Sequence, residues 1–261
     1  MPFMKSGQLK YFVFDSLQEA GLPHGIFTRL GGCSPKPWHT LNVATSVGDS
    51  RENVIENRRR IMSVFGRKYD SVLDALKILF DKVICSEKPR PLEKQHKKGD
   101  SVITSNPAVS LMMVFADCVP ILLFDPNKKV VGIAHAGWQG TINRVAGEAI
   151  TAMHLNYGCS PDNILAGIGP SIGPDHYKVG ISIINKVITA FPLQYQMFVN
   201  NKIRNNTFDL WEANKFVLQA AGVQNIEVSS ICTACNTKLW YSHRAENGET
   251  GRFAAVISLP M

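Results

Sequence analysis

Two stretches near the middle of the chain, Phe115-Ala-Asp-Cys-Val-Pro-Ile121 and Ala134-His-Ala-Gly-Trp-Gln-Gly140, decide how the fold is interpreted. The first lies inside the apolar run Ser110–Phe124, and the second ends the apolar run Val130–His135. Short runs rich in Val, Ile, Leu and Phe and bounded by turn residues are typical of buried strands. We therefore expect strands on both sides of the first stretch and a strand that leads into the second.

The turn sequence Asp125-Pro-Asn-Lys128 separates the two runs and predicts a short strand–turn–strand connection. Such a connection makes Cys118 and His135 neighbours in space. Because proline cannot continue a central ladder, we also expect the chain to bend at Val119-Pro120 and to present the side chain before it.

A thiol and an imidazole that converge can serve two chemistries. The first is a nucleophile pair, in which His135 lowers the pKa of Cys118. The second is part of a zinc or copper site built from soft sulfur and nitrogen ligands. The spacing alone leaves a third alternative open, in which both residues are structural.

Outside the predicted strand–turn–strand segment, the sequence pattern predicts strands and helices in irregular alternation. This favours an α/β or α+β fold with mixed sheets. No internal repeat or Pro/Gly-rich linker divides the chain, so we treat residues 1–261 as one domain. The expected strands are Tyr11–Phe14, Ile26–Arg29, Asp100–Thr104, Ile226–Ile231 and Phe253–Ile257, and the expected helices are Ser50–Phe65, Thr141–Tyr157, Ile183–Ala190 and Leu210–Ala221. The stretch Ser71–Phe80 fits either a helical stripe or a strand.

Composition narrows the class of protein. The chain is 45% hydrophobic and 19% charged, as ordinary globular proteins are. The run Ser110–Phe124 is interrupted by Asp117 and Pro120, and no run approaches the roughly 20 apolar residues of a membrane span. The first residues show no export signal, so we expect a cytoplasmic protein without a membrane partner, whose six cysteines are reduced thiols.

The formal net charge is +7, and much of the excess lies in short clusters such as Arg58-Arg-Arg60 and Lys94-Gln-His-Lys-Lys98. These clusters are either solvated surface or a means of attracting a small anion such as phosphate. We expect no nucleic-acid partner, because no recognised nucleic-acid-binding motif is present.

The two stretches resemble the signature motifs of a family known as YfiH-like or laccase-domain proteins, which is variously named polyphenol oxidoreductase, purine nucleoside phosphorylase and peptidoglycan editing factor. The likeness extends from about His24 to Ile257. Further matching segments are His24-Gly-Ile-Phe-Thr-Arg29, Leu41-Asn42, Gly48-Asp49, Glu56-Asn-Arg58, Gly99-Asp-Ser-Val-Ile-Thr104, Gly169-Pro-Ser-Ile-Gly-Pro174, Cys232-Thr233 and Ser242-His-Arg244.

This resemblance implies a mixed α-β-β-α sandwich, similar to the cytotoxic-necrotising-factor catalytic domain. It implies a metal, usually zinc, held by one cysteine and two histidines. The implied activity is phosphorolysis of purine nucleosides such as adenosine, inosine, guanosine and methylthioadenosine, with adenosine deamination alongside. The laccase name would instead imply copper-dependent oxidation of phenols.

One departure from the family pattern concerns the metal. Aligning Asp81-Lys-Val83 with the residues that usually follow the first histidine places Leu79 at the histidine position. Leucine cannot ligate a metal, and His96 is the nearest upstream substitute. The metal ligands that the resemblance assigns here are therefore only Cys118 and His135, while His24, His39 and His243 are further histidines that could approach the site.

Other residues carry weaker predictions. Arg29, Asn42, Arg58 and Arg244 are predicted to bind the substrate, as ribose or phosphate ligands, although each could equally cap a turn or form a salt bridge. Cys232-Thr-Ala-Cys235 has the spacing of a metal knuckle, but a single such pair is a weak signal and favours a structural turn. Asp117 is expected either to orient His135 or to accept backbone N–H groups at the bend.

Three functions follow. The leading hypothesis is a purine nucleoside phosphorylase with Cys118 and His135 as catalytic residues and purine nucleoside and phosphate as substrates. The second is a metal-free Cys–His hydrolase or amidase acting on cell-wall precursors. The third is a non-catalytic homologue, which the leucine at position 79 supports. The oligomeric state does not follow from the sequence.

Overall fold

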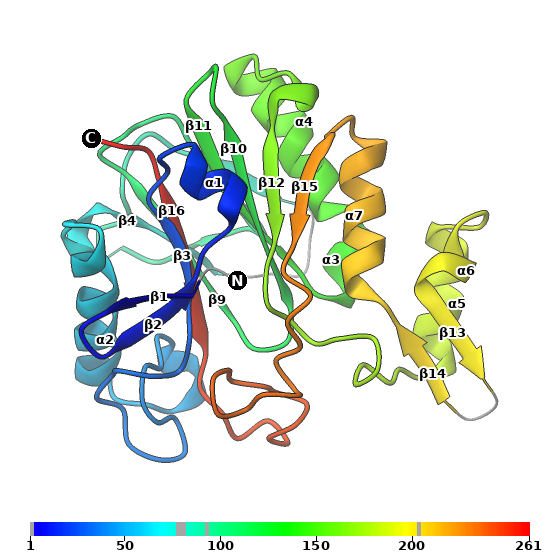
Figure 1. Cartoon of the computed structure of the whole chain (residues 1–261), viewed down its shortest axis with the longest axis horizontal. Helices are drawn as coiled ribbons and strands as arrows, with labels where there is room; N and C mark the ends of the chain where they lie inside the picture. Colours follow the sequence, from blue (N-terminus) through cyan, green and yellow to red (C-terminus); the bar gives the residue numbers. More distant parts are fainter. Residues whose placement is uncertain (1–2, 77–81, 92–93, 203–204) are drawn as a thin grey trace.

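The computed structural model of the chain describes residues 3–76, 82–91, 94–202 and 205–261. Two six-stranded sheets form its centre, and helices cover their outer faces (Figure 1). This arrangement is the predicted mixed-sheet α-β-β-α sandwich.

The first sheet combines strands from both ends of the chain in the order β1-β2-β3-β16-β9-β4. Its C-terminal strand β16 lies between β3 and β9 and is antiparallel to both. The strands are β1 (Phe3–Ser6), β2 (Leu9–Phe12), β3 (His24–Phe27), β4 (Val72–Leu73), β9 (Ser110–Phe115) and β16 (Phe253–Ser258).

The second sheet has the order β15-β12-β10-β11-β8-β6 and mixes antiparallel with parallel pairs. At its centre, β10 and β11 form the predicted antiparallel unit around the turn at Asp125. The strands are β6 (Val83–Cys85), β8 (Ser101–Thr104), β10 (Val119–Asp125), β11 (Val130–Ala136), β12 (Leu165–Ile168) and β15 (Asn225–Val228).

The central strands read as continuous apolar runs because both of their faces are buried. In β10, Leu122 and Phe124 join the core between the two sheets, while Ile121 and Leu123 join the core beneath the helices. Because successive side chains point to opposite faces of the sheet, this one strand contributes to two hydrophobic cores.

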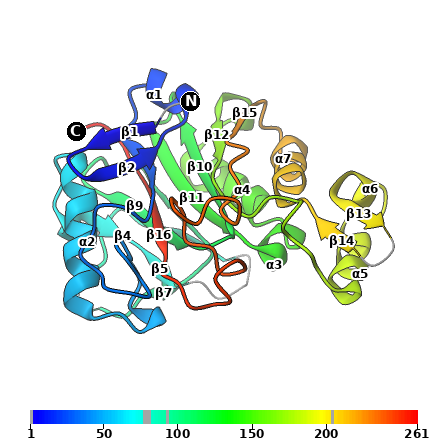
Figure 2. The same ribbon diagram turned by 60° about the horizontal axis from the view of Figure 1, so that its bottom comes forward.

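Helices cover each sheet from outside (Figure 2). Helix α2 (Arg51–Val64) packs Ile61 and Met62 against the first sheet, and the Ser50 hydroxyl accepts a hydrogen bond from the Asn53 N–H at its start. The second sheet carries α4 (Val145–Tyr157) and α7 (Leu210–Ala220). The helix α5 (Ile181–Ala190) and the short α6 (Tyr195–Phe198) lie with the hairpin β13 (Val199–Lys202) and β14 (Asn205–Phe208) beyond α7.

The smaller elements complete the chain. They are α1 (Asp15–Glu19), α3 (Trp138–Ile142), the paired strands β5 (Ala75–Leu76) and β7 (Lys97–Lys98), and the 3-10 turns η1 (Thr45–Val47), η2 (Tyr69–Ser71) and η3 (Pro161–Asn163).

The predicted helix Thr141–Tyr157 is wrong at its beginning. Helix α3 ends at Ile142, and α4 begins at Val145 after Arg144 adopts a left-handed conformation with φ of 57°. A single left-handed residue breaks the helical ladder without a glycine or proline to mark it, so the pattern does not reveal it. The predicted end at Tyr157 is confirmed, because Gly158 follows it as a C-cap with φ of 67°.

The ambiguous stretch Ser71–Phe80 begins at the end of η2 and, as far as it is described, continues as strands β4 and β5 and not as a helix. Leu79 lies outside the described residues. No helix in the described part of the chain is both long and apolar enough to cross a membrane.

Candidate active site

The bend before β10 is made by Asp117 and not by the proline. Asp117 has φ of 77°, a left-handed conformation that aspartate tolerates better than most residues. Pro120, contrary to the expectation, lies inside β10 opposite His135. This left-handed residue turns the chain between β9 and β10, so that Cys118 lies directly before the first residue of β10, at the end of the β10–β11 pair.

The strand register brings the two predicted catalytic residues to one end of the sheet. Val119 pairs with Ala136, so Cys118 precedes the last pair on one strand and Gly137 follows it on the other. A Cβ on Gly137 would lie 2.9 Å from the Cys118 sulfur, which shows how closely the backbone passes the thiol. Any side chain at position 137 would therefore displace the Cys118 thiol.

His135 is held firmly in place. Its backbone N–H donates to the Asp100 carbonyl at 2.8 Å, and its ring stacks on Phe115 with centroids 4.9 Å apart. The residue is 5% exposed. Because it is buried and stacked on Phe115, the imidazole is oriented by packing before any ligand arrives.

Cys118 and His135 line one cavity of about 350 Å³, within the range of small-molecule sites. His243 and Arg252 line the same cavity from a loop near the C-terminus. The remaining lining residues are Ser46, Ala75, Met113, Val114 and Ala116.

Arg252 supplies the cation of this cavity, and sequence reasoning missed it. The pairing of Phe253 with Phe115 places Arg252 beside the turn that carries Cys118. Burial lowers the pKa of Arg252, while the nearby Cys118 and Asp117 act in the opposite direction. The sequence could have indicated this residue, because a charged side chain directly before a fully buried strand lies where that strand enters the sheet.

Asn42, one of the predicted substrate ligands, supports Arg252. Its side-chain oxygen accepts the Arg252 backbone N–H at 2.9 Å, and its amide donates to Asp49 at 2.9 Å. Asn42 is fully buried. Four hydrogen bonds to and from the protein therefore occupy the side chain in this structure.

Arg29 and Arg58 are also buried among protein partners. Arg29 pairs with Glu246 at 2.8 Å and lies over the Tyr241 ring, and Arg58 pairs with Asp74 at 2.9 Å. Neither lines the cavity that holds Cys118. Contact with substrate at these two positions stays a prediction.

Arg244 lies on the loop beside the cavity. It is exposed, its guanidinium lies 5.1 Å from the Tyr177 ring, and it donates to the Lys178 carbonyl at 2.7 Å. Its backbone N–H donates to the Asp117 carboxylate at 2.6 Å. The backbone of Arg244 thus helps hold the bend, while a phosphate contact by its side chain stays a prediction.

His96 joins an ion cluster and not the cavity lining. Its Nε2 lies 3.1 Å from Asp74, whose carboxylate also contacts Arg58 and Arg90. Hydrogen bonds from His96 and Arg90 outweigh burial and hold the pKa of Asp74 well below its usual range.

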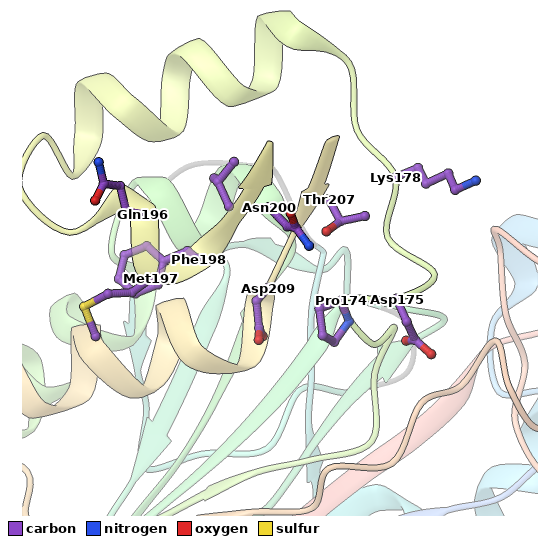
Figure 3. A pocket seen from close by; sticks show the side chains of 10 residues that line it. Pro174, Asp175, Lys178, Gln196, Met197, Phe198, Asn200, Thr207 and Asp209 are labelled. Atoms are coloured by element: carbon purple, nitrogen blue, oxygen red, sulfur yellow. The ribbon is translucent and has the colours of Figure 1, made fainter. Parts of the chain in front are cut away.

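A larger cavity, of about 630 Å³, lies elsewhere. It opens between the loop at Pro174–Lys178 and the β13–β14 hairpin, with Met197 and Phe198 on one side and Pro174 and Asp175 on the other (Figure 3). No cysteine or histidine lines it. Its size alone therefore gives no reason to prefer it as the catalytic site.

All six cysteines are free thiols in this structure. Two of them, Cys232 and Cys235, lie with Asp175 and His176 in a group whose ligand atoms are all within 4.8 Å of one another. This is the only group of three or more metal-ligating side chains at such spacing among the residues that the structure describes. Cys118 and His135 are not part of it.

Comparison with known proteins decides the family. The model of the multi-copper polyphenol oxidoreductase laccase family matches residues 23–260. The chain belongs to this family. The purine nucleoside phosphorylase YlmD of Bacillus subtilis is 33% identical over 244 residues, which cover 90% of this chain and 87% of that protein.

Two solved structures share the fold. The crystal structure of YlmD from Geobacillus stearothermophilus has a TM-score of 0.92 at 30% identity, and that of the Bacillus licheniformis hypothetical protein YfiH has 0.91 at 31%. Each comparison covers 99% of both chains. The resemblance found in the sequence is confirmed.

Proposed function

We propose that this laccase-family chain cleaves purine nucleosides with phosphate, in the cavity that Cys118, His135, His243 and Arg252 line. The observation that carries the proposal is the convergence of a thiol, two imidazoles and a partly buried guanidinium on one cavity of about 350 Å³. The relatives named purine nucleoside phosphorylase, which align over nearly the whole chain, support this choice of reaction.

In phosphorolysis a phosphate oxygen forms a bond to C1′ of the ribose while the bond from C1′ to the purine nitrogen breaks. The electron pair of that bond goes to the purine, which then takes up a proton, and the products are ribose 1-phosphate and the free base. The protein must hold an anion at one side of the sugar and stabilise negative charge on the base at the other.

Arg252 is the residue we assign to phosphate. A guanidinium can meet two phosphate oxygens with parallel hydrogen bonds, and partial burial strengthens the attraction. We assign the proton that the departing purine takes up to one of the two histidines of the cavity, His135 or His243. Cys118, at the same strand end as His135, is assigned to contact the purine and hold it against the proton donor, so its removal or displacement stops or slows the reaction.

The metal that the family resemblance implies fits the described residues only in part. Cysteine sulfur and histidine nitrogen are zinc ligands, but structural and catalytic zinc sites hold at least three protein ligands. Among the described residues, Cys118 and His135 do not belong to a group of three or more closely spaced ligands. The proposed reaction therefore relies on side chains of this chain and not on zinc or copper.

The test is release of hypoxanthine from inosine and of adenine from adenosine, with and without inorganic phosphate. We expect release to require phosphate, to yield ribose 1-phosphate, and to be lost in Cys118→Ala and His135→Gln. Cys33→Ala is the matched control, because Cys33 is an exposed thiol outside the cavity.

Base release that continues unchanged without phosphate would refute the proposal, as would full activity in Cys118→Ala. In the same assays, inosine formed from adenosine reports deamination, and oxidation of a phenol with added copper reports the chemistry of the laccase name. Activity that appears only in Leu79→His would favour the non-catalytic alternative for this chain.

A further inference from the structure

A second cluster of reactive side chains lies outside the cavity of Cys118. It consists of Asp175, His176, Cys232 and Cys235, and we refer to it as the loop cluster. Asp175 and His176 belong to the loop after β12, and the two cysteines belong to the loop after β15.

The sheet topology brings these loops together. Strands β12 and β15 are parallel neighbours, so both loops leave the same edge of the second sheet. A bridge between Ser171 and Cys232 continues their pairing beyond the regular strands. The spacing of the two cysteines then turns both thiols toward the same point, as a metal knuckle does.

The distances agree with a tetrahedral centre. His176 Nδ1 lies 3.8 Å from the Cys232 sulfur and 3.5 Å from the Cys235 sulfur. At zinc, with bonds of about 2.3 Å to sulfur and about 2.0–2.1 Å to nitrogen, such ligand atoms lie about 3.6 Å apart. The Asp175 oxygen, 3.0 Å from His176 Nδ1 and 4.0 Å from the Cys235 sulfur, completes a fourth corner.

A backbone contact outside the ligand set supports the same geometry. The Gly173 N–H donates to the Cys232 sulfur at 3.2 Å, a hydrogen bond that stabilises a thiolate and fixes its direction. A Cβ at Gly173 would lie 2.8 Å from an Asp175 oxygen and 3.2 Å from the Cys232 Cβ. Glycine thus lets the first loop approach the second closely enough to share a ligand.

We propose that the loop cluster is a tetrahedral zinc site with two sulfur ligands, one nitrogen and one oxygen. Zinc takes all three ligand types, and a site with four protein ligands is of the closed, structural kind. The site goes beyond the proposed phosphorolysis, since none of its ligands lines the cavity of Cys118.

The structure also indicates what the zinc site would stabilise. Ile172, on the first loop, donates its N–H to the Asp117 carbonyl at 2.9 Å, and Thr233, between the cysteines, donates its hydroxyl to the Asp117 carboxylate at 2.7 Å. Zinc would therefore crosslink the loop after β12 and the loop after β15, which both bind Asp117 at the bend before Cys118.

Zinc binding to the full chain tests the proposal. Cys118→Ala is the background, because it removes the thiol of the other candidate metal pair, Cys118 and His135. The reduced, metal-free protein is titrated with Zn²⁺ against a chromophoric chelator and, separately, with Co²⁺. We expect one equivalent of either metal, the absorption of tetrahedral cobalt with sulfur ligands, and a higher melting temperature with zinc.

In the same background, Cys235→Ser and His176→Gln each remove a zinc ligand. Changes to residues that only support metal ligands typically lower affinity by about 10- to 100-fold, and we expect each of these two substitutions to lower zinc affinity by more than that. Both residues are exposed, so their replacement leaves the core intact. Cys33→Ser, which removes an exposed thiol elsewhere, is the matched control and should bind zinc like its parent.

Three results would overturn the zinc site: no stoichiometric metal in Cys118→Ala, equal affinity after Cys235→Ser, or a Cys232–Cys235 disulfide found by mass spectrometry in protein purified without oxygen. None of these readouts depends on nucleoside cleavage. Failure of the zinc site is therefore distinguishable from failure of the proposed function.

Discussion

The carboxylate of Asp117 accepts a hydrogen bond from the backbone N–H of Arg244 at 2.6 Å, across 127 residues of sequence. Its other oxygen accepts the Thr233 hydroxyl at 2.7 Å. The bend that presents Cys118 is thus tied to the C-terminal loop that contributes His243 to the same cavity. One side chain connects the two halves of the candidate site.

Asp117→Asn tests this connection. Asparagine tolerates the left-handed backbone as aspartate does, but it offers one acceptor oxygen where two are used. We expect a loss of about 1–3 kcal/mol in the free energy of unfolding, measured by urea titration, together with lower phosphorolysis. Asp70→Asn, at an exposed aspartate, is the control and should change neither quantity. Unchanged stability in Asp117→Asn would contradict the role assigned to the carboxylate.

Gly137→Ala tests whether the position of the Cys118 thiol matters. The backbone at Gly137, with φ of −78° and ψ of −174°, accepts alanine without strain, so the new Cβ acts only by displacing the sulfur 2.9 Å away. Misplacement of a reacting group by about 1 Å can cost about 100-fold in rate. We expect kcat/KM for inosine to fall by about 10- to 100-fold with little change in melting temperature.

Gly147→Ala is the matched control for that substitution. Gly147 lies within α4, where a Cβ would meet Val217 at an ordinary 3.5 Å. Alanine should stabilise the helix by about 0.5–1 kcal/mol and leave activity unchanged. If both alanine variants behaved alike in kinetics, the proximity of Gly137 to Cys118 would have no catalytic meaning.

From the structure we assign phosphate binding to Arg252, whereas the sequence predicted it for Arg244. Comparing Arg252→Lys with Arg244→Lys tests which of the two arginines binds phosphate. Lysine keeps the charge but loses the two-pronged guanidinium. We expect Arg252→Lys to raise the KM for phosphate by about tenfold, equivalent to about 1.4 kcal/mol, while Arg244→Lys changes it less. Steady-state kinetics with phosphate varied at saturating inosine measure both. A larger effect at Arg244 would reverse the assignment.

The sequence predicts those residues of the site that lie close together along the chain. Cys118 and His135 are joined by one hairpin, and apolar runs with a turn between them were enough to make them neighbours. The resemblance to the family supplied the sandwich architecture. The bend was misassigned to Pro120 because a left-handed aspartate leaves no mark in an apolar pattern.

The rest of the cavity depends on long-range strand order. Arg252 reaches Cys118 because β16 pairs with β9, and nothing local specifies that pairing. The same holds for the loop cluster, where His176 meets Cys235 only through the parallel pairing of β12 with β15. A single pair of cysteines was a weak signal for metal until the topology brought a histidine and an aspartate to it.

His24 gives the last prediction, which concerns stability and pH. Its Nε2 accepts the Phe14 N–H at 2.9 Å, and its Nδ1 donates to the Leu22 carbonyl at 2.7 Å, so the buried ring is neutral. Burial lowers the pKa of His24, although the backbone partners and Glu227 act in the opposite direction. In the unfolded chain the ring takes up a proton at a higher pH than in the folded protein.

The stability that His24 contributes is therefore present above the ordinary histidine pKa of about 6.5 and declines as the pH falls toward the lower pKa of the folded state. We expect the free energy of unfolding to drop between about pH 7.5 and about pH 5.5, by on the order of 1 kcal/mol more than in His24→Gln. Urea titrations of both proteins at each pH measure the difference. Parallel curves for the parent and His24→Gln would show that the ring does not titrate as its burial requires.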